Sequence, residues 1–497
     1  MTDNIDKIPQ TPQHRDHNLR AFSLMKIDKR HLTFLAFICG IIVVALALPF
    51  LPEKLVYVVI AAVPAAIIAA YILRNPVLGI YIYFILEFLR PSDFFPALSA
   101  LRLPMIVEII TLVSWILYLV KSKTKIKWDN FNWLYVGFIG AIGATVVFAY
   151  NPRYVFNTFQ AMAVSLIIFI MATNLLNSLP RVKKLILILL LIHVYYALRG
   201  IYNFAVVGFV SAGMQTSGVV GSSFMSDEND YALALNFMIP FAFFMVSYAR
   251  NRIEKYGSLA MLLIMVPGVL ISMSRGGWLG LVSIVILCLV KSKRKLVSLG
   301  LTVLLGVLMF SLAPKDYWTR IATITETGEG SAHARILYWQ AGLRMLMKNP
   351  VLGVGAGNGP IKMPEYVTGW RESATQWGRT FHGTFPQVMG ELGTIGLFLY
   401  LAMLIVMFKY MVRVERIKAP DDGDAMIMAH SIFVSVIGYI VGATFLSTAY
   451  YPQLWTLYTI GIILVFWSRT LKGTEIQIKE MPTLTGKSLD PDGFQQA

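Results

Sequence analysis

Runs of apolar residues, each long enough to cross a bilayer as a helix, recur along this chain from residue 32 to residue 468. One crossing needs about 20 residues, because a helix rises about 1.5 Å per residue through a hydrocarbon layer about 30 Å thick. Within hydrocarbon the backbone must pair its own amides and carbonyls, so each run is expected to be helical. Charged residues make up only 14% of the chain, too few to cover a soluble protein of this length.

The sequence therefore predicts an all-α polytopic membrane protein, with about 12–14 transmembrane helices and one large, partly helical loop on the non-cytoplasmic face. The predicted spans are 32–50, 54–73, 77–89, 104–120, 131–150, 156–178, 185–206, 231–249, 256–274, 277–290, 296–313, 386–408, 428–447 and 453–468.

Lysine and arginine indicate the orientation, since short cytoplasmic connections carry an excess of both. With the N-terminus in the cytoplasm, all the basic clusters between spans fall on the cytoplasmic face. We therefore expect a cytoplasmic tail at 1–31, about eleven spans within 32–313, an outer loop at 314–385, about three spans within 386–468 and a cytoplasmic tail at 469–497. The clusters lie at 121–127, 181–184, 250–255, 291–295 and 409–418.

The net charge of +16 follows from this topology and does not indicate nucleic-acid binding. Positive charge at the cytoplasmic face also attracts anionic lipid headgroups, so membrane lipids are expected partners. The two cysteines, Cys39 and Cys288, lie in apolar runs and indicate no disulfide framework.

Few predicted spans carry an ionisable residue, and those that do are candidates for function. Arg199 lies near the outer end of its predicted span and Arg275 in the tight Ser274–Trp278 turn between two spans. Either arginine could simply anchor in the outer headgroups. The glycines beside Arg275 would, however, let a large ligand group approach closely.

The predicted outer loop contains an amphipathic helix at 333–346 that ends before Asn349-Pro350. Arg335 and Arg344 are nine residues apart, so they should point to opposite faces of this helix. Arg335, with Trp339 beside it, is the better candidate for a ligand site. The following glycine-rich run, 353–360, fits neither nucleotide-binding fingerprint, and we interpret it as a turn.

His382 stands where the outer loop re-enters the membrane, at the level of a lipid headgroup, and its ordinary pKa near 6.5 suits proton transfer. Glu391 follows deeper in the same predicted span. The run Asp227–Asp230, including Asn229 and Asp230, is the nearest approach to a metal site, but carboxylates at a helix start usually cap the helix. We therefore predict no metal; arginines can hold a diphosphate by bidentate, charge-assisted hydrogen bonds.

Three motifs in this order resemble the O-antigen ligase and polymerase superfamily of bacterial envelope glycosyltransferases. They are the Ser-Arg-Gly-Gly-Trp turn at 274–278, the run from Arg335 through Trp339 to Gly355, and the re-entry run from His382 through Glu391 to Leu397. The segment 224–235 and the pair Arg199-Gly200 resemble the O-glycosylation ligases associated with exosortase systems. The resemblance covers about residues 70–468.

The resemblance implies an O-antigen ligase-like glycosyltransferase of the bacterial inner membrane, working at the periplasmic face. It would move a glycan from undecaprenyl diphosphate to a hydroxyl of lipid A-core or a similar acceptor, inverting the anomeric carbon without metal or cofactor. Arg275 and Arg335 would bind the diphosphate, with Arg199 and Trp339 assisting, and His382 would orient or deprotonate the acceptor. Glu391, Asn229 and Asp230 would have supporting roles.

Two alternatives stay open from the sequence. One is a polysaccharide polymerase or a protein O-oligosaccharyltransferase of the same superfamily, since acceptor choice depends on loop shape. The other is a transporter of lipid-linked glycans. Transporters favour internal repeats and charges at the membrane midplane, whereas the notable charges here lie at the predicted outer boundary.

Overall fold

We describe the protein from a computed structural model, which describes residues 53–207, 227–312, 331–368, 376–416 and 422–480. The predicted span 32–50 and most of both predicted tails lie outside these residues. The chain divides into two units, Met1–Ala70 and Tyr71–Ala497, and all the residues discussed below for function belong to the second.

Every predicted span within the described residues coincides with a helix, and no strand occurs among these residues. Nine of the described helices are long and apolar enough to cross a membrane, and two further apolar helices are shorter. The all-α polytopic fold is therefore confirmed. The helices at the predicted spans are α2 (Glu53–Arg74), α3 (Pro76–Leu89), α5 (Leu103–Ser122), α6 (Asn130–Ala144), α7 (Pro152–Leu175), α8 (Leu179–Val207), α9 (Glu228–Tyr248), α10 (Arg252–Ile271), α11 (Arg275–Lys291), α12 (Lys295–Leu312), α16 (Thr384–Glu415), α17 (Asp422–Ala443) and α18 (Pro452–Glu480).

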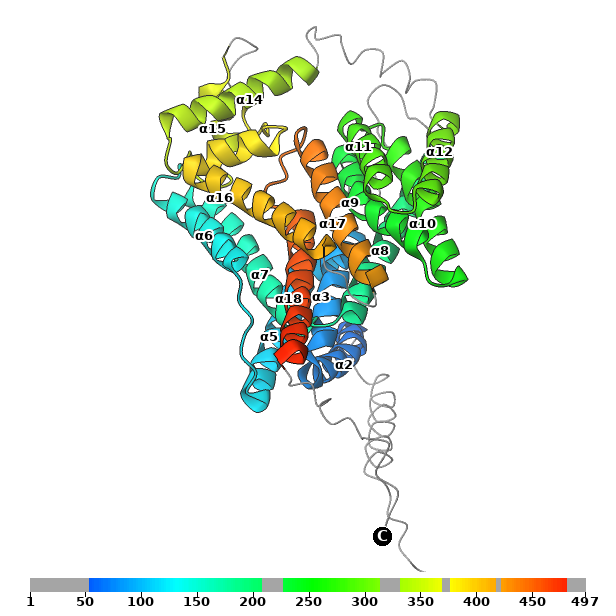
Figure 1. The fold of residues 1–497 in the computed structure, drawn as a ribbon. Helices are drawn as coiled ribbons and strands as arrows, with labels where there is room; N and C mark the ends of the chain where they lie inside the picture. The colour runs from blue at the N-terminus through cyan, green and yellow to red at the C-terminus, as the bar shows by residue number, and fades with distance from the viewer. Residues whose placement is uncertain (1–52, 208–226, 313–330, 369–375, 417–421, 481–497) are drawn as a thin grey trace, which may run out of the picture. The chain divides into compact units, whose positions relative to one another are not determined.

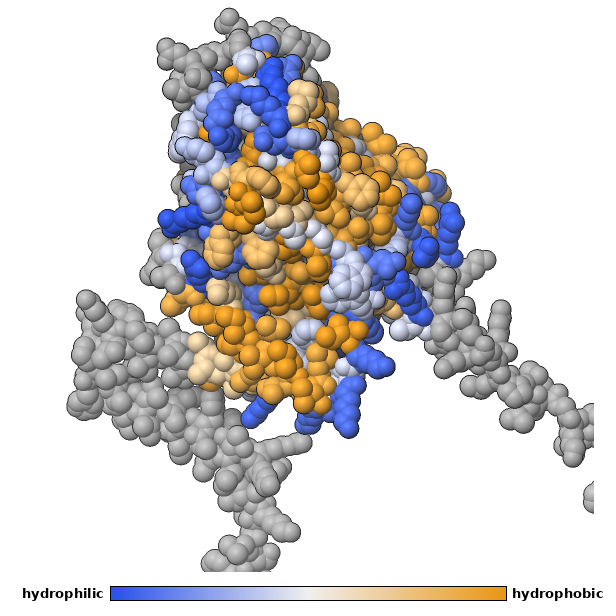
Figure 2. All heavy atoms as spheres, turned by 90° about the vertical axis from the view of Figure 1, so that its left-hand side faces the viewer, coloured by the Kyte–Doolittle hydropathy of each residue, from blue (hydrophilic) through white to orange (hydrophobic). Residues whose placement is uncertain are grey.

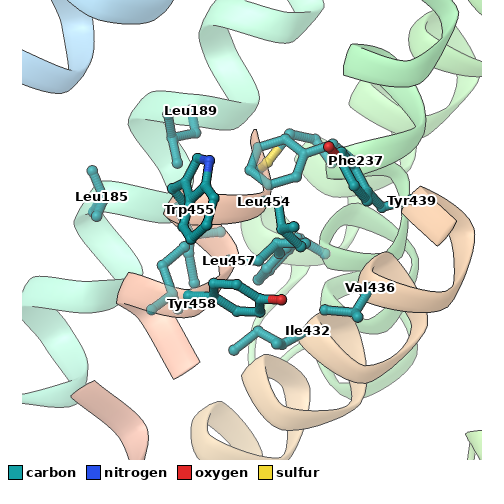
Figure 3. Packing of buried hydrophobic residues seen from close by; sticks show 14 of the residues in the cluster. Leu185, Leu189, Phe237, Ile432, Val436, Tyr439, Leu454, Trp455, Leu457 and Tyr458 are labelled. Atoms are coloured by element: carbon teal, nitrogen blue, oxygen red, sulfur yellow. The ribbon is translucent and has the colours of Figure 1, made fainter. Parts of the chain in front are cut away.

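Helix α9 lies at the centre of the second unit, and every residue from Tyr231 to Tyr248 is buried. It packs against α8, α10, α11 and α17 (Figure 1). Trp455 and Tyr458 of α18 extend the buried core into the space between α8 and α17 (Figure 3). A helix that is apolar on all sides suits such a central position.

The face shown in Figure 2 carries apolar side chains across its middle, with hydrophilic side chains towards both ends. On α5, for example, Ile109, Ile116 and Leu117 are about half exposed. An apolar band between polar ends is the surface that a bilayer requires.

Between α12 and α16 the chain forms two further helices, α14 (Ser331–Lys348) and α15 (Gly359–Tyr366), which lie beside the start of α16 (Figure 1). The predicted amphipathic helix at 333–346 is therefore present. Arg344 donates a hydrogen bond to the carbonyl of Tyr366 at the end of α15 (2.8 Å). This arginine fastens the two helices together, as expected for the side of α14 opposite Arg335.

Helix α16 is interrupted at Gly393, whose φ of 64° and ψ of −158° are not helical. The segment 349–358, which includes most of the glycine-rich run 353–360, fills this interruption. The amides of Val354 and Gly355 donate to the carbonyls of Gly390 and Glu391 (2.9 and 3.0 Å), and Thr394 donates to Pro350 (2.8 Å). The segment is a turn that satisfies the hydrogen bonds opened by the break in α16.

Gly393→Ala is expected to destabilise this junction, because a Cβ at Gly393 would lie 2.5 Å from the backbone of Val351 and the positive φ disfavours alanine. We expect a loss of about 1–3 kcal/mol, measured as a lower thermal unfolding midpoint in detergent. Gly140→Ala in α6, where no atom lies within 4 Å, is the control and should not lower the midpoint. Equal midpoints for both variants would contradict the role of this junction.

Candidate active site

Three segments far apart in the sequence bring Arg335 close enough to both Arg275 and His382 for their charges to interact. Arg275 begins α11, Arg335 lies on α14, and His382 immediately precedes α16. The charge of Arg275 lowers the pKa of Arg335, and the charge of Arg335 lowers the pKa of His382. All three side chains are half-buried. The structure therefore brings together the three residues that the sequence analysis selected as catalytic.

The start of α11 is held in place by Ser274, its N-cap residue. The Ser274 hydroxyl accepts from the amide of Gly277 (3.0 Å) and donates to Oδ1 of Asn229 on α9 (2.7 Å). Gly277 also allows close packing, because a Cβ there would lie 2.3 Å from Ala232. Serine is a favourable N-cap, and glycine permits the close approach. Arg275 thus projects from a firmly positioned helix start.

Arg335 and Trp339 share one face of α14 and both contact Phe445, in the connection between α17 and α18. The guanidinium of Arg335 lies 5.8 Å from the centre of the Phe445 ring, and the Trp339 ring centre lies 6.4 Å from it. Trp339 also donates from its indole nitrogen to the carbonyl of His382 (3.0 Å). Trp339 therefore supports the His382 segment directly.

His382 adopts a left-handed backbone conformation, with φ of 46°. Its ring centre lies 6.0 Å from that of Tyr338. Two residues later, Thr384 donates to the carbonyl of Leu446 (2.7 Å) and accepts from the amide of Thr448 (3.0 Å). A non-glycine residue at positive φ is uncommon and needs such support from its surroundings.

The site is strongly cationic, and neighbouring positive charges help to lower the pKa values of Arg335 and His382. Burial lowers the pKa of Arg335, and the nearby Arg275 lowers it further. Burial likewise lowers the pKa of His382, followed by the charges of Arg335 and Arg379, whereas Asp227 opposes the shift. Asp227 and Glu228 at the start of α9 offset part of the charge on Arg335. Half-buried guanidinium groups that repel one another favour the binding of an anion.

The acidic run at 227–230 serves the start of α9. Asp227 accepts from the amides of Asn229 and Asp230 as the N-cap residue. Asn229 accepts from Ser274, and Asp230 accepts from the hydroxyl of Tyr451 (3.0 Å). Asn229 and Asp230 therefore connect α9 to α11 and to the α17–α18 connection.

Glu391 is buried and fastens two loops. Its Oε1 accepts from the amide of Gly359 (3.3 Å), and its Oε2 accepts from the hydroxyl of Tyr450 (2.8 Å). These partners place Glu391 at the junction of α16 with the glycine-rich run. No hydrogen bond or ion pair between Glu391 and His382 occurs in the described part of the chain.

Arg199 is exposed on α8. Within the described ranges, no hydrogen bond, ion pair or cation–π contact joins it to Arg275, Arg335 or His382. The neighbouring Gly200 packs against α9, because a Cβ there would lie 2.2 Å from the hydroxyl oxygen of Tyr231. Gly200 therefore has a structural role, because it allows α8 and α9 to pack closely.

Sequence reasoning missed three participants. Asp227 was interpreted only as a cap, although its charge also reaches Arg335 and His382. Arg379, three residues before His382, was a visible cation that proximity alone could have suggested. Phe445 gave no signal, because an aromatic residue near a span end is ordinary.

Comparison with known proteins agrees with the resemblance seen in the sequence. Residues 260–401 match the family model described as O-Antigen ligase. The matched segment runs from α10 into α16 and contains Arg275, Arg335, His382 and Glu391. No curated protein matches the chain.

Proposed function

We propose that this chain is a ligase- or polymerase-type glycosyltransferase, because residues 260–401 match the O-antigen ligase family model. It transfers a glycan from undecaprenyl diphosphate to a hydroxyl of lipid A-core or a similar acceptor, at the periplasmic face of the bacterial inner membrane. The observation that carries the proposal is the convergence of Arg275, Arg335 and His382 at one end of the helices.

In the proposed step, the acceptor oxygen forms a bond to the anomeric carbon from the side opposite the diphosphate. The bond between that carbon and the diphosphate oxygen breaks, and the leaving diphosphate takes the electron pair. Arg275 and Arg335 stabilise the charge that develops on this leaving group. His382 orients the acceptor hydroxyl and takes its proton. The displacement inverts the anomeric configuration.

The proposal predicts transfer by the purified protein alone, given an undecaprenyl-diphosphate-linked glycan and lipid A-core. Because the two arginines supply the positive charge, activity should persist in excess EDTA. Loss of activity in EDTA that Mg²⁺ restores would contradict the metal-free step. Parallel reactions offering a second repeat unit or a pilin-like protein as acceptor test polymerase and protein O-glycosylation activity. Product formed only from one of these would overturn the lipid A-core assignment.

The environment of His382 predicts a specific pH dependence. A lowered pKa keeps the imidazole neutral, and able to accept a proton, at pH values where an ordinary histidine is largely protonated. Arg379→Gln removes a charge that lowers this pKa, so the acidic limb of the pH–activity profile should move to higher pH. Asp227→Asn removes the opposing charge and should move the limb to lower pH. Shifts in the same direction, or none, would contradict His382 as the base.

A further inference from the structure

A polar cavity lies at the same end of the helices as His382, and neither Arg275 nor Arg335 lines it. It comprises a space of about 310 Å³ and an adjoining space of about 180 Å³, which share Glu87 and Arg102 as lining residues. A narrower extension continues along α18 past Thr456 and Thr459. Cavities of several hundred cubic ångströms with a few polar groups are typical ligand sites.

The lining of the larger space has the chemistry that recognises sugar hydroxyls. Asn157, Gln160 and Ser165 of α7 offer amide and hydroxyl groups, and Tyr83, Glu87 and Arg102 complete the wall. Amides and hydroxyls both donate and accept hydrogen bonds, and the carboxylate and guanidinium add one acceptor-only and one donor-only group. Such a mixed set suits a ligand rich in hydroxyl groups better than a simple anion.

The α17–α18 connection separates this cavity from the arginine site and touches both. Phe445 contacts Arg335 and Trp339 on one side. Tyr450 lines this cavity, while its hydroxyl donates to Glu391. The next residue, Tyr451, donates to Asp230 at the start of α9. A ligand in the cavity would therefore lie one short segment away from the arginines and His382.

The cavity also borders an apolar surface. Met105 lines the larger space and is 37% exposed, and Ile106 and Ile109 on the same helix, α5, are 44% and 49% exposed. In a membrane these side chains contact acyl chains. A molecule with a glycan head in the cavity could keep its acyl chains along α5, which indicates an amphiphile.

We propose that this cavity, formed by α3, α5, α7 and α18, binds the glycan headgroup of the acceptor glycolipid. The inference rests on the proposed transferase function and deepens it, because it assigns acceptor and donor to opposite sides of the α17–α18 connection. Tyr450 and Tyr451 link the two sides, since Tyr450 lines the cavity and Tyr451 donates a hydrogen bond to Asp230 at the start of α9.

The test uses the full-length protein and the double variant Asn157→Ala/Gln160→Ala. Losing these amide contacts should raise KM for lipid A-core about tenfold while KM for the undecaprenyl-diphosphate-linked donor stays unchanged. Phe156→Ala is the matched control, since Phe156 lies on the same turn of α7 but does not line the cavity. It should leave both constants unchanged. A raised donor KM instead would show that the cavity holds the donor glycan and would overturn the proposal.

A binding measurement separates this inference from the proposed function. Calorimetric titration with deacylated core oligosaccharide, without donor, should show binding to wild type and to His382→Asn, and about tenfold weaker binding to the double variant. Equal binding to wild type and the double variant, with matching unfolding midpoints, would overturn the cavity assignment. Absence of transfer by wild type with every acceptor would overturn the proposed function, whatever the titration shows.

Discussion

Replacing His382 by asparagine is expected to reduce glycan transfer by about 10²–10⁴-fold, the range for loss of a general base. Asparagine is the appropriate substitution because it tolerates the positive φ of His382, whereas alanine would add backbone strain to the lost chemistry. Its amide can still hold an acceptor hydroxyl but cannot take the proton. The initial rate of transfer at saturating donor and acceptor measures the effect.

The control for this variant is His333→Asn, which removes another histidine of the α12–α16 segment. It should transfer at the wild-type rate, and both variants should unfold at wild-type temperatures. If His382→Asn retained more than about a tenth of the activity, His382 would be an orienting residue at most, and proton removal would have to occur elsewhere.

Removing either arginine should have an effect of similar size. Arg275→Ala and Arg335→Ala are each expected to lower the transfer rate by about 10²–10³-fold, as for the loss of a donor that stabilises a developing charge. Because both guanidinium groups serve the same diphosphate, the double variant should lose less than the product of the two single effects. Lys348→Ala, which removes an exposed positive charge from the same helix as Arg335, is the control.

Strictly multiplicative effects would contradict a shared ligand, since residues that act on one group depend on each other. Each arginine variant should also keep the wild-type unfolding midpoint. Arg335→Lys gives a further check, because it separates the charge of Arg335 from the planar guanidinium that lies against the Phe445 ring. It retains the charge but lacks the bidentate geometry, and it should recover only part of the lost rate.

The helices could be predicted from the sequence because each is encoded locally by a long apolar run. The same holds for the helix at 333–346 and for the opposite directions of Arg335 and Arg344, which follow from helical periodicity. Arg275 and His382 could be selected because ionisable residues are few in and beside the apolar runs, and both lie where a lipid headgroup would be presented.

The features that escaped prediction depend on contacts between distant segments. The break at Gly393 is stabilised by hydrogen bonds from the segment 349–358. The sequence of α16 alone does not predict the break, and neither does the sequence of that segment. Asp227 has a capping role that is visible locally, whereas its effect on His382 requires α9 and α16 to begin at the same end of the molecule. The cavity beside Tyr450 is likewise formed by four helices that no single motif connects.

The central claim is that Arg275 and Arg335 hold the diphosphate of a lipid carrier. Equilibrium binding of undecaprenyl diphosphate without glycan, to protein in nanodiscs, tests this claim without any need for turnover. The Arg275→Ala/Arg335→Ala variant should bind at least about tenfold more weakly than wild type, whereas His382→Asn should bind as wild type does. Wild-type affinity in the double arginine variant would contradict the account.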